Sequence, residues 1–473
     1  MRKTKKAVRQ ERPIAALLAP DIIDLLKHSP ADVAAETEEL HPADLADIVE
    51  LLPRSRVSAF LAALPGSRAS SVLEYVNEKL RSVLLEELST IEAAKLVEQM
   101  TPDDRADVLE ELGEERADEI LEAIPADARR ETQELLAFDP DTAGGLMTTE
   151  IVSVLESETV EHALAQVRTI ARSGRREAMN VVYVTDASRK LTGVISLREL
   201  LAAPEGARVT DIARSEVRSV VTSSDRAEVS RLISEYDIVA IPVVDDAGIL
   251  RGMVTVDDVI DVIQEKQTED VQRFGGLEAL EDPYMESRFV DMLKKRAGWL
   301  CVLFLGEMLT ASAMQYFEKE IAALVVLTLF IPLIVSSGGN SGSQATSLII
   351  RALALGEVSL KDWWRVARRE LTAGIALGVI LGTIGVLRVL AWQGLGIYEY
   401  GPNYLRIAVV VGFSLLGVVM FGTLAGSMLP FILRRLGFDP ASASAPFVAT
   451  LVDVTGLVIY FSVALILLKG YGL

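Results

Sequence analysis

Apolar residues recur with a helical period through residues 13–138. Four stretches open with Ser, Thr, Pro or Asp, carry acids in the first turn, and then repeat Leu, Ile or Val every three to four positions: LHPADLADIVELLP (40–53), LSTIEAAKLVEQM (88–100), MTPDDRADVLEELGE (100–114) and ERADEILEAIP (115–125). These are helix-start signals followed by helical periodicity. Because a unit of roughly twelve residues repeats, the pattern predicts a superhelix of short stacked helices.

Short β-branched runs replace this pattern between residues 141 and 265. NVVYVTDASRKLTGVISLRELL (180–201) and VAIPVVDDAGILRGMVTVDDVI (239–260) match in outline, each with a strand, a turn, a second strand and a helix start. Each follows a helical stretch, around 158–172 and 225–236. The repeat predicts two β-α-β-β-α modules that pack as a pseudo-twofold pair. The polar residues 261–292, rich in Glu, Asp and Gln, then predict a connecting helix.

From about Ala297 the chain contains apolar runs of the ~20 residues that a bilayer core requires. We place five spans at 297–317, 321–350, 371–392, 405–433 and 446–468. The expected fold is therefore multi-domain: an all-α superhelical domain (1–138), an α/β module pair (139–263), a connecting helix (264–293) and a five-helix transmembrane domain (294–473).

The loop charges orient these spans, because Lys and Arg accumulate on the cytoplasmic side. One side holds ten basic residues: Lys294, Lys295, Arg296, Arg351, Lys361, Arg365, Arg368, Arg369, Arg434 and Arg435. The other side holds Lys319, Arg406 and Lys469, with Arg388 near a span end. We therefore expect a multi-pass protein of the plasma (cell inner) membrane, with its N-terminal domains cytoplasmic and its C-terminus outside.

The net charge and the count of Cys and His limit which partners and metal ions the chain can bind. The formal net charge is −20, and residues 293–473 carry about +5, which leaves about −25 for residues 1–292. An acidic region does not suit polyanionic nucleic acid; it suits cations, although solubility alone also explains it. With one Cys and three His, a disulfide framework and an N/S zinc or copper site are excluded. Any metal must be a hard cation held by oxygen. The basic N-terminus precedes polar sequence, so no signal peptide is expected.

Asp453 lies near the middle of the last apolar run, where a charge costs roughly 2.5–3.5 kcal/mol. Intramembrane acids usually mark an ion or substrate pathway, although a neutral carboxyl bonded to a neighbouring helix is the alternative. The stretch SSGGNSGSQATS (336–347) also lies at membrane depth, and it must be buried in protein or line a cavity. Glu307 is a second acid in a span, and Asp439 precedes the last span, where it caps a helix or binds a cation.

Acidic clusters mark the soluble part: Asp103/Asp107, Asp225/Glu228, Asp237, Asp257/Asp258/Asp261 and Glu265/Glu269/Asp270. Each cluster alone is explained by helix capping or by a solvated face. Together they suggest a regulatory mechanism in which like charges repel one another across the interfaces between domains. A divalent cation bound between them would relieve this repulsion and draw the domains together.

These motifs resemble the MgtE family of magnesium channels or transporters over nearly the whole chain. The resemblance rests on HPADLADIVELLP, MTPDDRADVLEEL, two cystathionine-β-synthase-type (CBS) modules around GVISLREL and GMVTVDDV, GGNSGSQATSLIIRALALG, and SAPFVATLVDVTGLVIYFS. It implies a homodimer with a Mg²⁺ pore on the twofold axis, with Asp453 as the main ion ligand. Asn340, Ser343 and Ser347 would line the pathway. Ser343 and Ala445 stand where some members have asparagine.

The resemblance also implies that intracellular Mg²⁺ closes the pore by binding between the cytoplasmic domains. The matching acids are Asp103, Asp107, Asp237, Asp258, Asp261, Glu269 and Asp270, and we add Asp225 and Asp439 as candidates. Lys266 stands where an acid is expected. The resemblance also makes ATP a candidate ligand of the CBS cleft, since family members can bind it there: Thr255 and Asp258 fit a ribose contact, Arg198 is a candidate, and Ser196–Glu199 has Glu in the place of Asp.

The sequence as a whole predicts a homodimeric Mg²⁺ channel or transporter for uptake, gated by intracellular Mg²⁺, with lipid as its surroundings and no nucleic-acid partner. A secondary transporter of another divalent cation, such as Co²⁺ or Mn²⁺, is the first alternative. A membrane-anchored cation or nucleotide sensor is the second. An enzyme is not expected, because no nucleophile–base constellation, P-loop or zinc motif is present.

Overall fold

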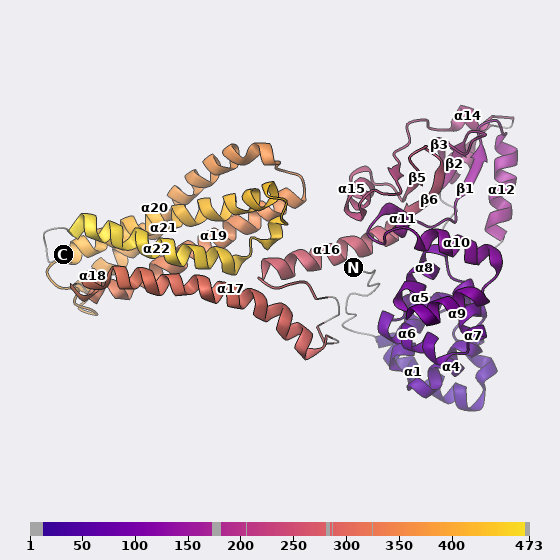
Figure 1. Cartoon of the computed structure of the whole chain (residues 1–473), viewed down its shortest axis with the longest axis horizontal. Coiled ribbons are helices and arrows are strands. Elements are labelled where there is room, and N and C mark those ends of the chain that lie inside the picture. The colour runs from indigo at the N-terminus through magenta and orange to yellow at the C-terminus, as the bar shows by residue number, and fades with distance from the viewer. Residues whose placement is uncertain are drawn as a thin grey trace. The chain divides into compact units, whose positions relative to one another are not determined.

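The computed structural model describes residues 13–172, 181–204, 206–280, 284–285, 287–323 and 325–468 (Figure 1). The basic N-terminus and Lys469 lie outside the described residues. The chain divides into two compact units, Met1–Lys266 and Gln267–Leu473, which are considered separately below.

Short helices build the first part of the N-terminal unit, as the sequence predicts. Four of them fall within the four stretches quoted above: α3 (Pro42–Leu51), α7 (Thr90–Glu98), α8 (Pro102–Glu111) and α9 (Glu114–Ala123). The others are α1 (Pro13–His28), α2 (Val33–Glu36), α4 (Arg54–Ala63), α5 (Gly66–Tyr75), α6 (Glu78–Glu87) and α10 (Ala126–Leu136). Their apolar faces meet in one core that includes Leu45, Phe60, Leu73, Leu85 and Ile120.

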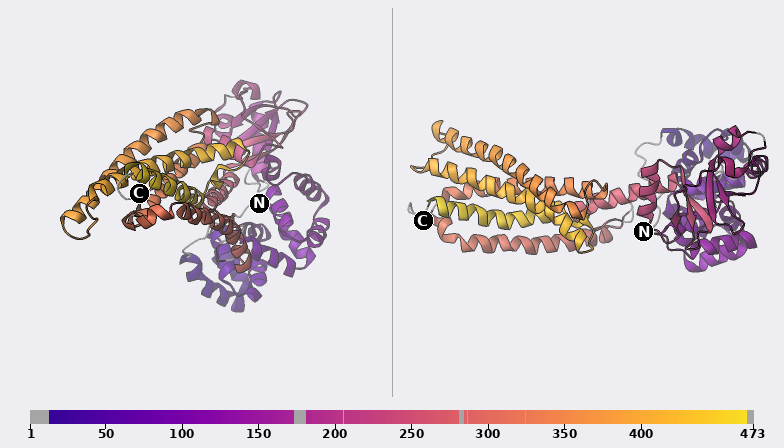
Figure 2. Two further views of the ribbon diagram at one scale, coloured as in Figure 1. Left: turned by 60° about the vertical axis from the view of Figure 1, so that its left-hand side comes forward. Right: turned by 90° about the horizontal axis from the view of Figure 1, so that it is seen from above.

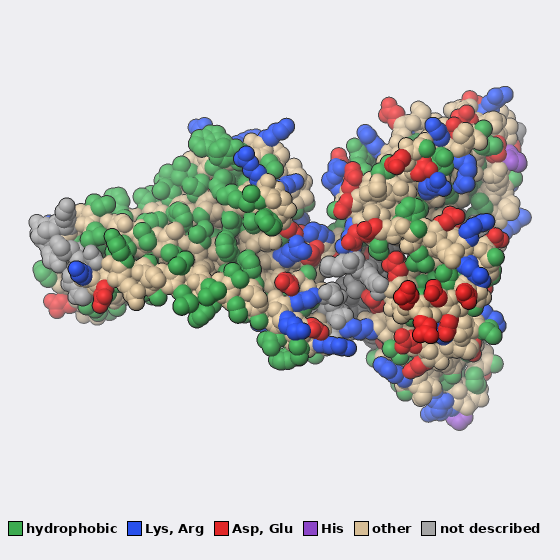
Figure 3. All heavy atoms as spheres, in the orientation of Figure 1, with side chains coloured by type: hydrophobic (Ala, Val, Ile, Leu, Met, Phe, Trp, Pro, Cys, Tyr) green, Lys and Arg blue, Asp and Glu red, His purple; other side chains and the backbone are tan. Residues whose placement is uncertain are grey.

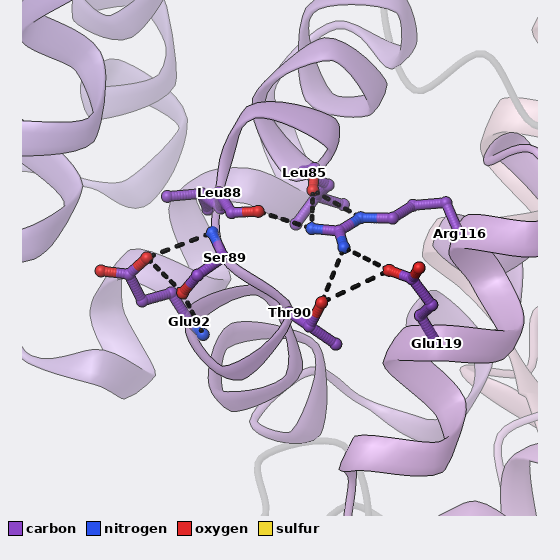
Figure 4. Close-up of polar contacts among 7 residues, drawn as sticks. All are labelled: Leu85, Leu88, Ser89, Thr90, Glu92, Arg116 and Glu119. Carbon is purple, nitrogen blue, oxygen red and sulfur yellow. Dashed lines mark hydrogen bonds and ion pairs between the residues drawn. The ribbon is translucent and has the colours of Figure 1, made fainter.

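Arginine side chains close the ends of these helices. The last carbonyls of a helix have no partner within it, and a cation nearby is also favoured by the helix dipole. Arg116 donates to the carbonyls of Leu85 (2.9 Å) and Leu88 (2.5 Å), and also to Thr90 Oγ1 (2.9 Å), as Figure 4 shows. Arg68 binds three carbonyls in the same way, those of Thr37, Glu38 and Leu40. The helical repeat is thus held by polar contacts as well as by its core.

Arg81 combines such a cap with a buried ion pair. Its Nη1 donates to the carbonyls of Leu73 (3.3 Å) and Glu74 (3.2 Å), while its Nε donates to Glu111 Oε2 at 2.8 Å. The two charged side chains are only 6% and 3% exposed. Removing one partner of such a pair leaves an uncompensated buried charge, at a typical cost of about 3–5 kcal/mol. The pair therefore fixes α6 against α8.

The two repeated modules each form a three-stranded sheet. In the first, β1 (Val152–Leu155) pairs parallel with β2 (Val181–Thr185), which pairs antiparallel with β3 (Leu191–Ser196). In the second, β4 (Val220–Val221), β5 (Ala240–Val244) and β6 (Leu250–Thr255) repeat this order. The accompanying helices are α11 (Ala143–Leu146), α12 (Val160–Arg172), α13 (Leu197–Ala202), α14 (Val209–Ile212), α15 (Arg226–Tyr236) and α16 (Val256–Phe274).

The modules contact each other, as expected for a pseudo-twofold pair. The Leu191 amide donates to the carbonyl of Gly248 at 3.1 Å, and the Leu250 amide donates to the carbonyl of Arg189 at 3.0 Å. Tyr183 from the first module packs in a small core with Leu250 and Met253 from the second. The two amide–carbonyl contacts join equivalent positions of the repeats, so the repeat in the sequence corresponds to a repeat in the structure.

The C-terminal unit consists mainly of long apolar helices: α17 (Phe289–Tyr316), α19 (Ile331–Ala354), α20 (Trp363–Gly394), α21 (Tyr404–Arg435) and α22 (Ala445–Leu468). They lie side by side in Figures 1 and 2. Helix α18 (Glu318–Ala323) and the 3₁₀ helix η3 (Val325–Phe330) precede α19, which explains the excess length of the predicted span 321–350. Among the described residues, five segments are long and apolar enough to cross a membrane, so the five-span prediction is confirmed.

Glycines bring α19 and α21 into backbone contact. A Cβ added to Gly422 would lie 2.4 Å from the carbonyl oxygen of Gly338, and one added to Gly426 would lie 2.2 Å from that of Gly342. Thr346 Oγ1 donates to the carbonyls of Gly342 and Gly426, both at 2.9 Å. Small residues at this spacing are typical of close helix pairs in membranes. The contact requires glycine, because a side chain would meet backbone that cannot move aside.

Candidate ion-binding site

Helix α19 is regular through the polar stretch 336–347. Its glycines do not free the backbone to line a cavity, because Gly338 and Gly342 face α21. The opposite side of the helix carries polar side chains: Ser336, Asn340, Gln344 and Ser347 are exposed, and Ser343 is half-buried. Positions 336, 340, 343 and 347 recur at helical spacing and form one polar strip. The candidate pathway residues therefore share one face of a continuous helix.

Helix α22 packs antiparallel beside this strip. Ser343 Oγ donates to the Ala445 carbonyl at 3.4 Å, and a Cβ on Gly339 would lie 3.6 Å from the Cα of Ala449. A Cβ on Gly338 would meet Val452. Asp453 is the next residue of α22, so its backbone lies near the level of Gly338 and Gly339. The structure thus brings the two positions at which this chain lacks an asparagine, Ser343 and Ala445, into direct contact.

Asp453 on α22 is half-buried. The carboxyl of Glu307 on α17 lies close enough to interact electrostatically with it. The two helices approach closely there, since a Cβ on Gly306 would lie 3.0 Å from Thr450 Cγ2. Two carboxyl groups in contact hold a proton or a cation between them, because like charges otherwise repel. Glu307 is therefore a second candidate ligand, beside Asp453.

The entrance to α22 holds a second polar group. Asp439 Oδ1 accepts from the Ala441 amide at 2.9 Å and so caps the short 3₁₀ helix η5 (Pro440–Ser442). Its Oδ2 accepts from Arg273 Nη1 at 2.5 Å, and Arg273 Nη2 also binds Glu269 Oε1 at 2.5 Å. Two of the acids that the sequence assigns to cation binding are thus bridged by an arginine, a residue that the sequence reasoning missed.

The acids of the N-terminal unit have mixed environments. Asp103 and Asp258 are buried, Asp107 and Asp261 are half-buried, and Asp225 and Asp237 are exposed. Asp225 caps α15 by accepting from the Ala227 amide at 2.7 Å, and Asp237 ends the same helix in a left-handed conformation with φ +50°. Among the described residues, no group of three or more Asp, Glu, His or Cys side chains could hold one metal ion. Any cation held by protein ligands there would keep much of its water.

The expected nucleotide contacts differ between the two modules. Thr255 Oγ1 donates to Asp258 Oδ2 at 2.9 Å, so this buried carboxylate is already oriented, while Arg198 is exposed. In the first module, Ser196 donates to Glu199 and Arg214 pairs with it at 2.6 Å, which lowers the pKa of Glu199 to about 2. Glu199 is therefore occupied as a helix cap, and Thr255–Asp258 is the better fit to a ribose.

Family models match three parts of the chain. A model described as a divalent cation transporter matches residues 331–463, the MgtE intracellular N domain matches residues 40–141, and the CBS domain matches residues 143–206 and 209–265. The CBS matches coincide with the two three-stranded modules. The transporter match covers α19 to α22 and thus includes the polar strip and Asp453.

Known relatives match most of the chain. The magnesium transporter MgtE of Thermus thermophilus is 42% identical over 72% of this chain and 73% of its own length. The magnesium transporter MgtE of Enterococcus faecalis is 33% identical over 72% of each chain. A crystal structure of the soluble part of a magnesium transporter matches 53% of this chain and 99% of its own, with 29% identity and a TM-score of 0.51. The chain is therefore a membrane transporter rather than an enzyme, and it belongs to the MgtE family.

Proposed function

We propose that this chain mediates Mg²⁺ uptake across the plasma membrane along a pathway beside Asp453. The single observation that carries the proposal is the position of Asp453, a half-buried acid in a membrane-length apolar helix, directly after Val452, which packs against Gly338 of α19. The names of its relatives, both magnesium transporters, support Mg²⁺ as the transported ion. Mg²⁺ releases its water reluctantly, so a few carboxylate, amide and hydroxyl oxygens suit it better than a dry cage.

The polar strip also supports a homodimer. Asn340, Gln344 and Ser347 are exposed in a single chain, and polar side chains of a spanning helix rarely face lipid. A second copy on this face would enclose the strip and place two Asp453 carboxylates along one pathway. Four negative oxygens would then face a doubly charged ion.

We further propose that intracellular Mg²⁺ closes this pathway by binding acids of the cytoplasmic region and of α16. Reconstituted protein should carry Mg²⁺ into liposomes rapidly when the N-terminal side is free of Mg²⁺, and slowly at millimolar Mg²⁺ on that side. A fluorescent Mg²⁺ indicator inside the liposomes measures the rate. A rate that does not change with Mg²⁺ on the N-terminal side would contradict the gating proposal but not the transport proposal.

Arg273 should set how much Mg²⁺ this closure needs. Its guanidinium supplies positive charge between Glu269 and Asp439, where a cation would otherwise bind. Arg273→Gln removes that charge, so both carboxylates become available to Mg²⁺. Mg²⁺ that closes the chain should also protect it from protease, so the Mg²⁺ concentration at half-protection measures this closure. For Arg273→Gln we expect that concentration to fall about tenfold. A tenfold change corresponds to ~1.4 kcal/mol, which is a modest part of the interaction energy of two such ion pairs.

Two variants control this measurement. Arg273→Lys keeps the charge and should leave the Mg²⁺ midpoint near that of the wild type. Arg231→Gln removes an exposed arginine from an (i, i+4) pair with Glu235 and should have no effect. Equal midpoints for Arg273→Gln and the wild type would show that the arginine does not compete with the ion.

ATP is proposed as a ligand of the second CBS module only. The Thr255–Asp258 contact orients a carboxylate that could accept from ribose hydroxyls, whereas the Arg214 pair occupies Glu199 in the first module. ATP would supply no chemistry there, since this is a transporter; its role would be to stabilise the module pair.

A further inference from the structure

The first two turns of α20 extend beyond what a membrane span requires. The helix has 32 residues, and ~20 are enough for the hydrocarbon core. Its apolar run begins at Leu371, so the segment Trp363–Glu370 lies outside that run. Eight residues of helix rise ~12 Å, which exceeds the ~5–8 Å of headgroup layer on one side of a bilayer. The segment therefore spans the headgroup level.

This segment has one buried face and one exposed face. Val366 and Ala367 are buried at 7% exposure, and Val366 packs with Ile349 and Leu353 from α19 and Phe431 from α21. The exposed face carries two adjacent indoles, Trp363 at 51% and Trp364 at 65% exposure, which contact each other edge to face. The buried face fixes the segment on the bundle. Among the described residues of the C-terminal unit, both indoles remain largely exposed.

Four exposed cations lie in this region: Lys361 in the preceding 3₁₀ helix η4 (Leu360–Asp362), and Arg365, Arg368 and Arg369 in α20. Asp362 lies between Lys361 and the three arginines, but its carboxylate accepts from the Ser359 amide (2.9 Å) and hydroxyl (2.7 Å). In the described part of the chain, none of the four cations has an ion-pair partner within 4.0 Å. Figure 3 shows Lys and Arg side chains gathered toward one end of the apolar unit.

We propose that the surface formed by Lys361, just before α20, and by Trp363, Trp364, Arg365, Arg368 and Arg369 of α20 binds the headgroups of anionic phospholipids. Indoles prefer the headgroup level of a membrane, where their rings are partly apolar and their N–H groups can donate. Guanidinium groups bind phosphate through paired hydrogen bonds. The two features together fit a lipid, which offers phosphate and apolar glycerol–acyl surface side by side. A free phosphate ion would bind the guanidinium groups but would offer no apolar surface to the indoles.

Exposed apolar residues further along α20 favour the same occupant. Leu371 (37%), Ile375 (43%) and Val379 (53%) continue from the headgroup level into the apolar run. A lipid whose headgroup binds the arginines could lay its acyl chains along these side chains. Each Lys or Arg near an anionic membrane surface contributes ~1 kcal/mol, which is roughly fivefold in affinity.

The test measures lipid binding to the purified full chain in detergent by native mass spectrometry, with phosphatidylglycerol and phosphatidylcholine as probes. The wild type should retain phosphatidylglycerol in preference to phosphatidylcholine. The variant Arg365→Gln/Arg368→Gln/Arg369→Gln should bind phosphatidylglycerol at least ~10-fold more weakly, as the loss of three cations implies. The variant Trp363→Ala/Trp364→Ala should weaken both lipids, because it removes the apolar part of the surface.

A matched variant removes three exposed arginines of the N-terminal unit, Arg54→Gln/Arg168→Gln/Arg172→Gln, with the same change in net charge. It should bind phosphatidylglycerol like the wild type. Size-exclusion chromatography shows whether each variant is folded. The proposal is overturned if the α20 arginine variant, while folded, matches this control. It is also overturned if inorganic phosphate displaces phosphatidylglycerol at equal concentration, which would identify a phosphate site rather than a lipid surface.

Discussion

Replacing Asp453 with alanine should reduce Mg²⁺ flux into liposomes at least ~10-fold. Two unit charges ~4 Å apart at a protein surface interact by about 4 kcal/mol, and a divalent ion doubles this attraction. Asp453 is the carboxylate of α22 that follows the contact of Val452 with Gly338 of α19, so its removal takes away the main proposed attraction for the ion at membrane depth. The flux of wild-type and Asp453→Ala protein, measured with an internal Mg²⁺ indicator, gives the ratio directly.

Two further variants show whether the loss of flux is specific to Asp453. Glu307→Gln keeps Asp453 and removes only its carboxyl neighbour, so we expect a smaller loss of flux than for Asp453→Ala. Asp118→Ala removes an exposed carboxylate of α9 and should leave flux unchanged. Undiminished flux in correctly folded Asp453→Ala would exclude the proposed pathway. A similar loss in Asp118→Ala would indicate a general effect of charge.

Gly426→Ala should lower the thermal stability of the purified protein by several degrees. The added Cβ would lie 2.2 Å from the carbonyl oxygen of Gly342 and 2.8 Å from Thr346 Oγ1. Because one contact is with backbone, α19 and α21 must separate, and the paired hydrogen bonds of Thr346 are then lost. Overpacking of this kind costs about 1–3 kcal/mol, and the hydrogen bonds add to it. Size-exclusion chromatography after heating measures the midpoint.

Gly394→Ala is the matched control for this substitution. Gly394 ends α20, and a Cβ added there meets nothing within 4 Å. Alanine also has the higher helix propensity, so the variant should be as stable as the wild type or slightly more stable. If both substitutions changed the midpoint equally, the α19–α21 contact would not be the cause.

Much of the fold could be predicted because its patterns are local. The Ser, Thr or Pro before each N-terminal helix and the repeated strand pairs are short-range signals, and α3, α7, α8, α9, β2, β3, β5 and β6 follow them. Hydropathy alone predicted five spans. The extra length of 321–350 was less clear, because η3 and α19 join at Phe330 without any polar break.

The candidate site was predictable only in its residue types. Intramembrane Asp453 and Glu307 were each visible in the sequence, but their contact depends on the packing of α17 against α22. The sequence left open whether the stretch 336–347 is buried in protein or lines a cavity, whereas the structure packs its glycines against α21 and leaves Asn340 on the other face. Arg273 was missed because Asp439 lies 166 residues further along the chain, and no local pattern joins them.

The arginine caps of the N-terminal helices should make the stability of this region insensitive to pH. Arg68 and Arg116 each bind carbonyls 28–31 residues earlier, so they tie together turns of the superhelix that are distant along the chain. A guanidinium remains protonated at any physiological acidity. The superhelix should therefore keep its stiffness while the cytosol acidifies.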